Sequence, residues 1–328
     1  MKSILQKVLC VLATISIIVF AVYKLGYYLR PTSTDFCIDA INTFHSMPCD
    51  SIEVIGYGSS HEWHAINPEV LYDEYGIGAY NYGCNWQKIN TSLLFLEDSF
   101  RTQKPKVVLM ETGKIDVFKM DENVDGEIYY TKAIDEFDGK FRYLKQALGR
   151  NKERFFSYYV PLCAFHDNWI SLEESSFYTD LSYSSDYYST MGYDANDSVI
   201  EVNIPSYNPS VQSDLWPESI ECLDRMLEVC KDNDAELILF TVPWEGEFAF
   251  TDALHEYAAQ NGCVYLDLFE HLDEIGLDGK TDFLDGAHVN NNGAEKVSKF
   301  LGNYLLQNYD LTDYRTVDNN IWEQNLKR

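Results

Sequence analysis

Residues 52–61 read IEVIGYGSSH, an apolar run that ends in a glycine turn bearing two serines and a histidine. The apolar residues predict a buried β-strand, and the glycines predict a tight turn directly after it. A serine on such a turn is presented at the carboxyl edge of a sheet, which is where open α/β folds place their ligands. Ser60 is therefore a candidate nucleophile, with Ser59 as the alternative.

A second motif, DGAH at residues 285–288, follows much later in the chain and precedes a helical stretch. Its spacing allows one loop to supply both the imidazole of His288 and the carboxylate of Asp285 that orients it. A hydroxyl, a base and an orienting acid are the minimum parts of an activated serine nucleophile. The two motifs together predict a catalytic site of Ser60, His288 and Asp285. In the simpler alternative, the serine and the acid cap helices and the histidine lies on the surface.

The chain around these motifs alternates between short apolar runs and stretches with helical periodicity. Further strands are predicted at residues 79–82, 107–110, 237–242 and 264–266. Helices are predicted at residues 67–75, 86–100, 217–230, 253–260 and 294–306. Strands that alternate with helices imply a parallel sheet covered on both faces.

Regular periodicity is lost between about residues 115 and 215, where Tyr, Ser, Asp and Asn are frequent. A structureless loop of this length is improbable in a compact domain. We therefore predict a large insertion that packs as a lid or subdomain and is helical around residues 134–146.

The composition limits the possible partners. The 328 residues are 46% hydrophobic, enough for one large domain with its own core. The formal net charge of −27 would repel a phosphate backbone, which excludes nucleic acid as a partner. Aromatic residues make up 15% of the chain and include 24 Tyr. Both tyrosine-rich surface loops and a cleft facing carbohydrate fit this enrichment.

The N-terminal segment predicts a membrane anchor. No charged residue occurs from residue 8 to residue 23, and the apolar character continues to residue 29, about the ~20 residues that cross a bilayer. The small residues of a signal-peptide cleavage site do not follow. We predict an uncleaved transmembrane anchor at 1–30, a juxtamembrane connector at 31–49 and the main domain at 50–328.

Lysine and arginine are nearly balanced on the two sides of the apolar segment, so they set its orientation only weakly. We predict a single-pass membrane protein with the main domain outside the cytoplasm.

The cysteines and histidines give no sign of a metal site. The chain has eight cysteines without a C-x-x-C motif, so neither a disulfide framework nor a zinc ribbon is indicated. Cys37 with Cys49 is the only pair that we consider for a disulfide. His61 and His64 flank Glu62, but this spacing is one residue short of the zinc motif H-E-x-x-H. We therefore predict no metal and no cofactor.

These motifs resemble those of the SGNH/GDSL hydrolases, over residues 51 to about 322. The closer match is their membrane-anchored branch, similar to the D-alanyl transfer protein of teichoic acid synthesis and to polysaccharide O-acetylation proteins. The motifs that carry the resemblance are GSSH at 58–61 followed by NP at 67–68, YNYG at 80–83, KPKVV at 104–108, HDNW at 166–169, DGAHVN at 285–290 and DYR at 313–315. The resemblance implies an α/β fold: a flavodoxin-like three-layer α/β/α sandwich with a central parallel sheet.

The resemblance also implies roles for individual residues. Ser60 would be the nucleophile, His288 the base and Asp285 the orienting acid. The backbone N–H groups of Ser60 and Gly83 would line the oxyanion hole. The family's third motif carries an asparagine, whereas this chain has Glu-Thr-Gly at 111–113, so one side-chain donor is missing or comes from elsewhere. Loss of one such donor typically costs ~2.7–4 kcal/mol in the transition state.

Further candidates are weaker. Asn85 and Gln87 are candidates for the missing oxyanion donor. His61, Gln87, His166 and Trp169 are candidates for binding substrate, although ordinary packing is the alternative for the last two.

The implied activity is that of a serine esterase or O-acyltransferase on acyl esters of cell-envelope or extracellular polysaccharide, through an acyl-serine. The implied partners are the acyl-ester and carbohydrate substrates and a multi-spanning membrane O-acyltransferase. One alternative is a non-catalytic module that binds polysaccharide or scaffolds a partner protein. A generic secreted esterase or deacetylase is the other.

Overall fold

The computed structural model describes residues 2–29, 36–115, 131–149, 152–160, 162–163, 166–172 and 190–326. Its centre is a five-stranded parallel sheet with strand order β2-β1-β3-β4-β5. The strands are β1 (Val54–Tyr57), β2 (Ala79–Asn81), β3 (Val107–Glu111), β4 (Glu236–Thr241) and β5 (Val264–Asp267). This is the flavodoxin-like order. The predicted fold class is confirmed.

Side chains of the sheet alternate between two apolar cores. In β3, Val108 and Met110 belong to one core cluster, and Val107 and Leu109 belong to the other. All four are nearly or completely buried. Successive side chains of a strand point to opposite faces, so a strand with helices on both faces is apolar throughout. This is why the strands appear in the sequence as uninterrupted apolar runs.

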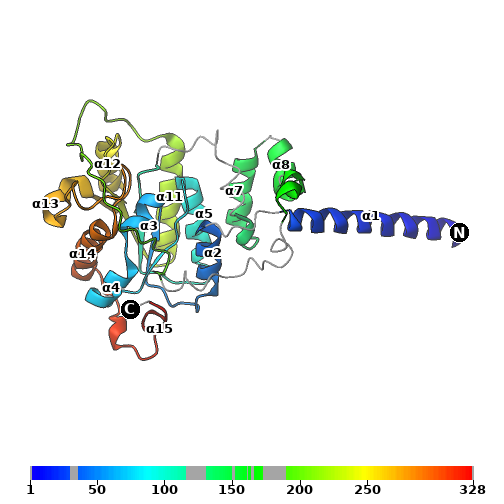
Figure 1. Ribbon diagram of the computed structural model, residues 1–328, viewed down its shortest axis with the longest axis horizontal. Helices are drawn as coiled ribbons and strands as arrows, with labels where there is room; N and C mark the ends of the chain where they lie inside the picture. Colours follow the sequence, from blue (N-terminus) through cyan, green and yellow to red (C-terminus); the bar gives the residue numbers. More distant parts are fainter. Residues whose placement is uncertain are drawn as a thin grey trace.

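Helices cover both faces of the sheet and form a three-layer body (Figure 1). One face packs against α2 (Phe36–Ser46), α5 (Ile89–Ser99), α11 (Pro217–Asp232) and α12 (Thr251–Asn261). The other packs against α3 (Ser60–Ala65), α4 (Pro68–Tyr75), α13 (Leu272–Ile275) and α14 (Asn291–Asn308). The remaining C-terminal elements are η4 (Leu268–His271), η5 (Tyr314–Thr316) and α15 (Ile321–Asn325).

Local signals fix the ends of α4, next to the candidate serine. The side chain of Asn67 accepts the N–H of Glu69 at 2.9 Å and so caps the helix. Pro68 occupies the first turn, where its missing N–H costs nothing. Gly76 ends the helix with a φ of 71°, a conformation that glycine adopts without strain. The predicted helix at 67–75 is thus confirmed.

The described part of the segment expected to be a juxtamembrane connector packs into the core. It contains α2, whose side chains Ile41 and Phe44 are completely buried. Apolar residues recur there at helical spacing, and this face packs on the body. The considered disulfide is not formed: Cys37 and Cys49 are free cysteines, the first buried and the second exposed.

The described parts of the insertion do not form one lid. They comprise η1 (Thr131–Ala133), α7 (Asp138–Leu148), α8 (Lys152–Tyr159), η2 (His166–Ser171) and an irregular stretch from residue 192 to residue 215. The helix expected at 134–146 corresponds to α7, which packs outside α5. The irregular stretch returns to the body, where the N–H of Ile200 donates to the carbonyl oxygen of Phe283 at 2.9 Å.

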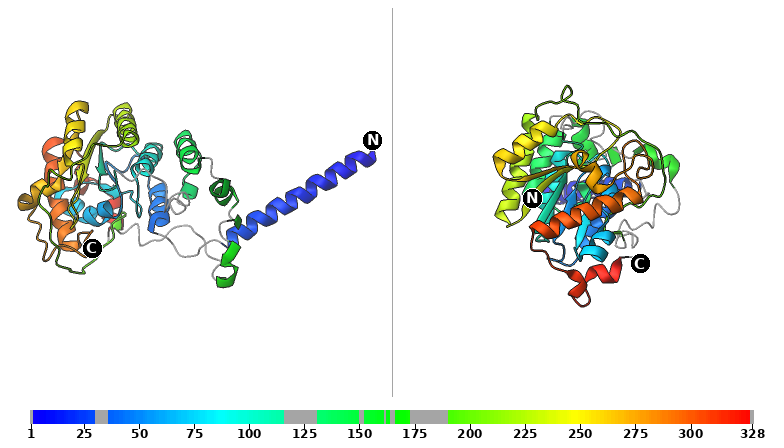
Figure 2. Two further views of the ribbon diagram at one scale, coloured as in Figure 1. Left: turned by 90° about the horizontal axis from the view of Figure 1, so that it is seen from above. Right: turned by 90° about the vertical axis from the view of Figure 1, so that its left-hand side faces the viewer.

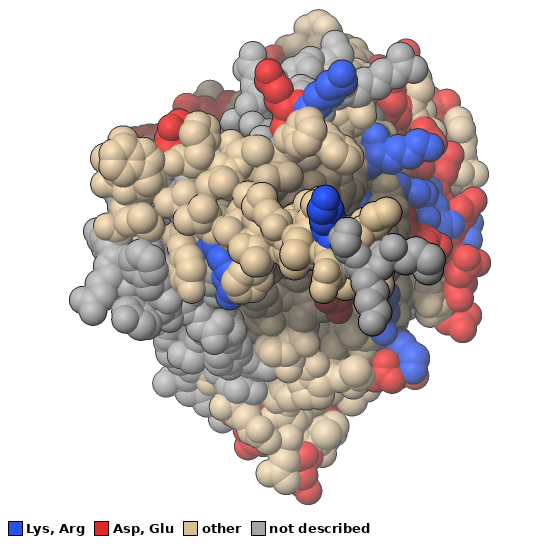
Figure 3. All heavy atoms as spheres, turned by 90° about the vertical axis from the view of Figure 1, so that its right-hand side faces the viewer, with Lys and Arg blue, Asp and Glu red and all other residues tan. Residues whose placement is uncertain are grey.

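Helix α1 (Lys2–Tyr28) projects away from the body (Figures 1 and 2). Among the described residues it is the one helix long and apolar enough to cross a membrane, over the 23 residues Ile4–Gly26 with a mean hydropathy of 2.4. None of this span is buried against the body. Figure 3 views the body from the side on which α1 projects. In that view α1 points toward the viewer, and the charged side chains of the described surface are most frequent along the right-hand side.

Candidate active site

Three side chains from opposite ends of the chain meet at the carboxyl edge of the sheet. Ser60 begins α3 immediately after the turn that follows β1. Its Oγ lies 2.7 Å from Nε2 of His288. On the other side of the same ring, Nδ1 lies 2.9 Å from Oδ2 of Asp285. Both distances are within hydrogen-bond reach, so the ring can accept the proton of the hydroxyl while the carboxylate orients it.

The carboxylate of Asp285 is held by more than the imidazole. Its Oδ1 accepts the backbone N–H groups of Ala287 at 2.7 Å and His288 at 2.9 Å. Partial burial raises the pKa of this carboxyl, but the hydrogen bonds from the His288 ring and the Ala287 N–H outweigh it. The net effect is a lowered pKa, so Asp285 is ionised when it orients the ring.

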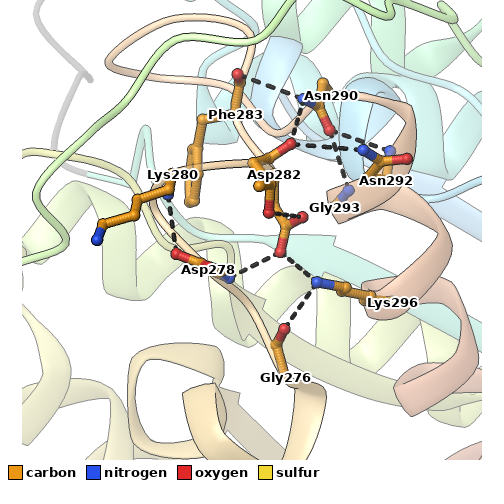
Figure 4. A network of polar contacts seen from close by, with 10 residues as sticks. Gly276, Asp278, Lys280, Asp282, Phe283, Asn290, Asn292, Gly293 and Lys296 are labelled. Carbon is orange, nitrogen blue, oxygen red and sulfur yellow. Dashed lines mark hydrogen bonds and ion pairs between the residues drawn. The ribbon is translucent and has the colours of Figure 1, made fainter.

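A polar network fixes the loop that carries these two residues (Figure 4). Its centre is the buried carboxylate of Asp282, which accepts Nζ–H of Lys296 at 2.6 Å and the N–H of Asp278 at 2.7 Å. Lys296 also donates to the carbonyl oxygen of Gly276 at 2.9 Å. The carboxylate of Asp282 is buried, whereas the side chain of Lys296 is 36% exposed, and the charged hydrogen bonds that meet at this carboxylate impose a defined geometry. It therefore ties the loop that carries Asp285 and His288 to α14.

Asn290 makes the second attachment of this loop. Its Oδ1 caps α14 by accepting the N–H groups of Asn292 and Gly293 at 3.0 and 3.2 Å. Its Nδ2 donates to the carbonyl oxygens of Thr281 and Ser198, at 2.9 and 3.0 Å. One side chain thus joins the helix, the catalytic loop and the returning end of the insertion.

Replacing Asn290 by Ala is expected to lower the free energy of unfolding by about 1–2 kcal/mol, because the cap and the loop bonds are both lost. A Ser at this position can still cap the helix, but its side chain is too short to reach the carbonyl oxygens of Thr281 and Ser198. Ser should therefore recover only the part of the stability that comes from the cap. Denaturant unfolding of the full-length protein measures these differences. Wild-type stability in the Ala variant would contradict this account.

Two further histidines surround the base. The ring of His61 stacks on Trp244 with centroids 5.1 Å apart and lies 5.3 Å from the ring of His288. The ring of His64 lies 5.0 Å from His288, and its Nδ1 donates to the carbonyl oxygen of Asp194 at 2.9 Å. Burial, and then the neighbouring His288, lower the pKa of His61 to about 3 and that of His64 to about 4. Both flanking rings are therefore neutral near pH 7.

The carboxyl groups of Glu62 and Glu111 are buried next to the turn that precedes Ser60. Burial, and then the nearby Glu111, raise the pKa of Glu62 well above its ordinary value. Neither of its oxygens has a hydrogen-bond partner among the described residues. Burial raises the pKa of Glu111 to about 7. Removing a carboxylate from water without a partner is costly, so Glu62 is protonated in the folded state.

Glycines make room for these carboxyl groups. A Cβ at Gly58 would lie 2.7 Å from the Cβ atoms of both Glu62 and Glu111. A Cβ at Gly83 would lie 2.5 Å from Oε2 of Glu62 and 3.0 Å from the carbonyl oxygen of Gly58. Side chains are excluded at both positions, whatever further role the backbone has.

The structure distinguishes Ser59 from Ser60 and leaves the backbone N–H of Gly83 without an acceptor among the described residues. The hydroxyl of Ser59 is buried and has no hydrogen-bond partner in the described part of the chain, so Ser60 is the serine that meets the base. The N–H groups of Ser60 and Gly83 donate to no acceptor in the described residues. Both are thus free to bind an oxyanion.

The structure gives Asn85 and Gln87 other contacts. The backbone N–H of the exposed Asn85 donates to Sγ of Cys37 at 3.1 Å. The side chain of Gln87 is buried, and its Nε2 donates to Ser92 at 3.0 Å. Among the described residues, neither side chain forms a hydrogen bond with Ser60 or His288.

The expectation that His166 and Trp169 flank the site does not fit the fold. Both side chains lie on η2 and are 63% and 65% exposed. Figures 1 and 2 place η2 and α8 beside the end of α1 and beyond α7, away from α3. The physical reason is that this part of the insertion packs outside the helical layer and not over the sheet edge.

Three side chains near the site were not found from the sequence. Trp244 and Glu245 lie on the loop after β4, where the N–H of Glu245 donates to the carbonyl oxygen of Gly286 at 2.9 Å. Glu111 ends β3. All three lie at or just after strand ends on the carboxyl edge, and this position is the signal that could have revealed them. In the described part of the chain, no group of three or more His, Cys, Asp or Glu side chains is arranged to hold a metal ion.

Comparison with known proteins finds a similarity among solved structures. No family model matches it, and no curated protein matches it. Among solved structures, it is similar to one described as a "putative acylhydrolase" from Bacteroides fragilis NCTC 9343. The identity is 11%, the TM-score is 0.40, and the match covers 81% of this chain and 94% of that one.

Proposed function

We propose that this protein is a serine esterase or O-acyltransferase that works through an acyl-serine at Ser60. One observation carries the proposal: Oγ of Ser60 lies 2.7 Å from Nε2 of His288, and Nδ1 of the same ring lies 2.9 Å from Asp285. This geometry activates a hydroxyl that is otherwise a weak nucleophile. A protein that only bound polysaccharide would not need it.

In the proposed reaction, Nε2 of His288 takes the proton from Ser60 while Oγ attacks the ester carbonyl. The N–H groups of Ser60 and Gly83 stabilise the oxyanion of the tetrahedral intermediate. Collapse of the intermediate expels the alcohol, which receives its proton from His288, and leaves an acyl-serine. Attack by water then gives hydrolysis, and attack by a sugar hydroxyl gives acyl transfer.

The proposed substrates are acyl esters of cell-envelope or extracellular polysaccharide, with a multi-spanning membrane O-acyltransferase as the acyl donor. The apolar, unburied helix α1 supports a single-pass anchor. We place the catalytic domain outside the cytoplasm.

The test uses a charged fluorophosphonate that does not cross membranes, applied to intact cells. Wild type and the matched control Ser59→Ala should be labelled, because the neighbouring serine does not contact the base. Ser60→Ala should not be labelled. In parallel, acyl content of the envelope polysaccharide should fall in Ser60→Ala cells and recover with wild type.

The other outcomes separate the alternatives. Labelling only after lysis would show that the domain faces the cytoplasm. Full polysaccharide acylation with Ser60→Ala would show a binding or scaffolding role. Fast turnover of simple esters, with acylation that rises when the protein is lost, would show an esterase that removes acyl groups.

A further inference from the structure

His61 is the side chain next to both the nucleophile and the base, and the mechanism above gives it no role. It follows Ser60 on the first turn of α3, and its ring is only 6% exposed. Trp244 lies almost parallel to the ring, at an interplanar angle of 21°, and the ring of His288 makes an edge contact with it at 5.3 Å. A ring packed against two other rings has a fixed direction in which it can donate or accept a hydrogen bond.

The two nitrogens of this ring have different surroundings. Nδ1 is buried, lacks a hydrogen-bond partner among the described residues and lies 3.9 Å from Oε1 of Glu111. Gly113 leaves the space that the ring occupies, since a Cβ there would lie 2.7 Å from Nδ1. Nε2 is at the opposite edge of the ring and is not among the buried atoms that lack a partner. It is therefore the nitrogen available to a substrate.

The ring carries one proton, and its location decides what Nε2 can do. Burial first, and then His288 and Lys114, hold the pKa of His61 at about 3. A neutral imidazole has one N–H donor and one acceptor nitrogen. If the proton is on Nε2, the ring can donate to a developing negative charge; if it is on Nδ1, Nε2 can only accept.

Glu111 lies where its protonation state can favour one of the two tautomers of His61. Its Oε1 accepts the N–H of Gly113 at 2.7 Å, and its Oε2 has no partner in the described residues. The group is completely buried. A movement of about 1 Å would bring it from 3.9 Å to within hydrogen-bond range (~2.6–3.2 Å) of Nδ1. A neutral carboxyl would donate to Nδ1 and leave the ring proton on Nε2, whereas a carboxylate would require the proton on Nδ1.

We propose that Nε2–H of His61 donates a hydrogen bond to the oxyanion formed at Ser60, and that Glu111 is the positioning residue that holds the ring in this tautomer. The inference rests on the proposed acyl-serine chemistry. When Oγ attacks, the electron pair of the carbonyl double bond moves to its oxygen, which then accepts three hydrogen bonds, from the N–H groups of Ser60 and Gly83 and from Nε2–H. No proton leaves His61, and the carbonyl double bond re-forms when the alcohol departs.

This arrangement makes acylation sensitive to pH. The groups that face Glu111 are His61 and Glu62 from α3, and Lys114, the N–H of Gly113 and the N–H of Val242 from the strand ends. The groups that act on His61 are His288, His64, Asp285 and Lys114. Burial raises the pKa of Glu111 to about 7. Below this pH the carboxyl is neutral and the donor tautomer is favoured; above it, the donor is lost.

The first test measures acyl-enzyme formation in single turnovers of p-nitrophenyl acetate by the full-length protein. His61→Phe keeps a flat ring but removes the donor, and should slow acylation at pH 6 by about 10²–10³-fold, with little change in KM. His61→Gln places an amide N–H near the position of Nε2 and should recover at least part of the rate. His255→Phe, on α12 away from the site, is the matched control and should behave as wild type.

The second test is the pH profile, which a purely structural role would not move. The wild-type rate should fall as pH rises through about 7. Glu111→Gln supplies an amide donor to Nδ1 at every pH, so this fall should disappear. Thermal unfolding shows which variants are folded. If His61→Phe is not folded, His61→Gln and Glu111→Gln still test the proposal.

Three results would overturn the inference in whole or in part. If wild type is labelled at Ser60 but His61→Phe and His61→Gln both acylate at the wild-type rate, the role of His61 is wrong and the proposed function stands. If Glu111→Gln keeps the wild-type fall above pH 7, Glu111 does not set the tautomer. If wild type forms no acyl-enzyme at all, the proposed function and this inference fail together.

Discussion

Replacing Asp285 by Asn is expected to slow acylation of Ser60 by about 10⁴-fold, with little loss of stability. The amide oxygen can still accept the N–H groups of Ala287 and His288, which now donate to Oδ1 at 2.7 and 2.9 Å. The amide nitrogen would face Nδ1 of the ring, 2.9 Å away in the wild type. Because an N–H donor there forces the ring proton onto Nε2, the ring would donate to Ser60 and could no longer take its proton.

The measurement is the burst of p-nitrophenol from purified full-length protein. Asp273→Asn changes an exposed acid on α13 in the same way and serves as the control. A rate within tenfold of wild type in Asp285→Asn would mean that the carboxylate does not orient the base, and Ser60 would have to be activated by another group.

The buried carboxyl groups should make folding less stable as pH rises. Glu111 has an ordinary pKa of 4.5 and a folded pKa of about 7. Between these values the unfolded chain releases a proton that the folded protein keeps, so this group alone should lower the free energy of unfolding by about 3 kcal/mol from pH 4.5 to above pH 7. The pKa of Glu62 is raised as well, so its contribution has the same sign.

Glu111→Gln removes this ionisation. Its free energy of unfolding relative to wild type should be about 3 kcal/mol more favourable at pH 8 than at pH 4.5. Denaturant unfolding of the full-length protein in detergent at the two pH values measures the difference. Glu218→Gln, an exposed position on α11, should show no such change. An equal effect of Glu111→Gln at both pH values would mean that the pKa of this carboxyl is the same in the folded and unfolded states.

The sequence predicted the sheet well because strands that are buried on both faces appear as uninterrupted apolar runs. Runs such as residues 107–110 have no place for a polar side chain, and helices between such runs imply parallel strands. The convergence of Ser60 with His288 and Asp285 was also predictable. A serine after a first strand and an Asp-x-x-His loop near a last helix both belong to the carboxyl edge of such a sheet.

Other features depend on tertiary contacts that no local pattern shows. Glu62 and Glu111 look like surface residues, and only their packing against Gly58 shows that they are buried. The stacking of Trp244 on His61 joins two strand ends that are far apart in the chain. For α2, the segment next to an apolar span looked like a linker, although its apolar spacing was already that of a helix.

The nucleophile and its base are separated by 228 positions, and this has a consequence for the newly made chain. The ribosome synthesises Ser60 with the first strand, but the base and its acid follow the fifth. Until the loop at residues 276–293 has been translated and docked on α14, the serine is only an alcohol of ordinary reactivity. An unfinished chain therefore lacks the activated serine on which the proposed function depends.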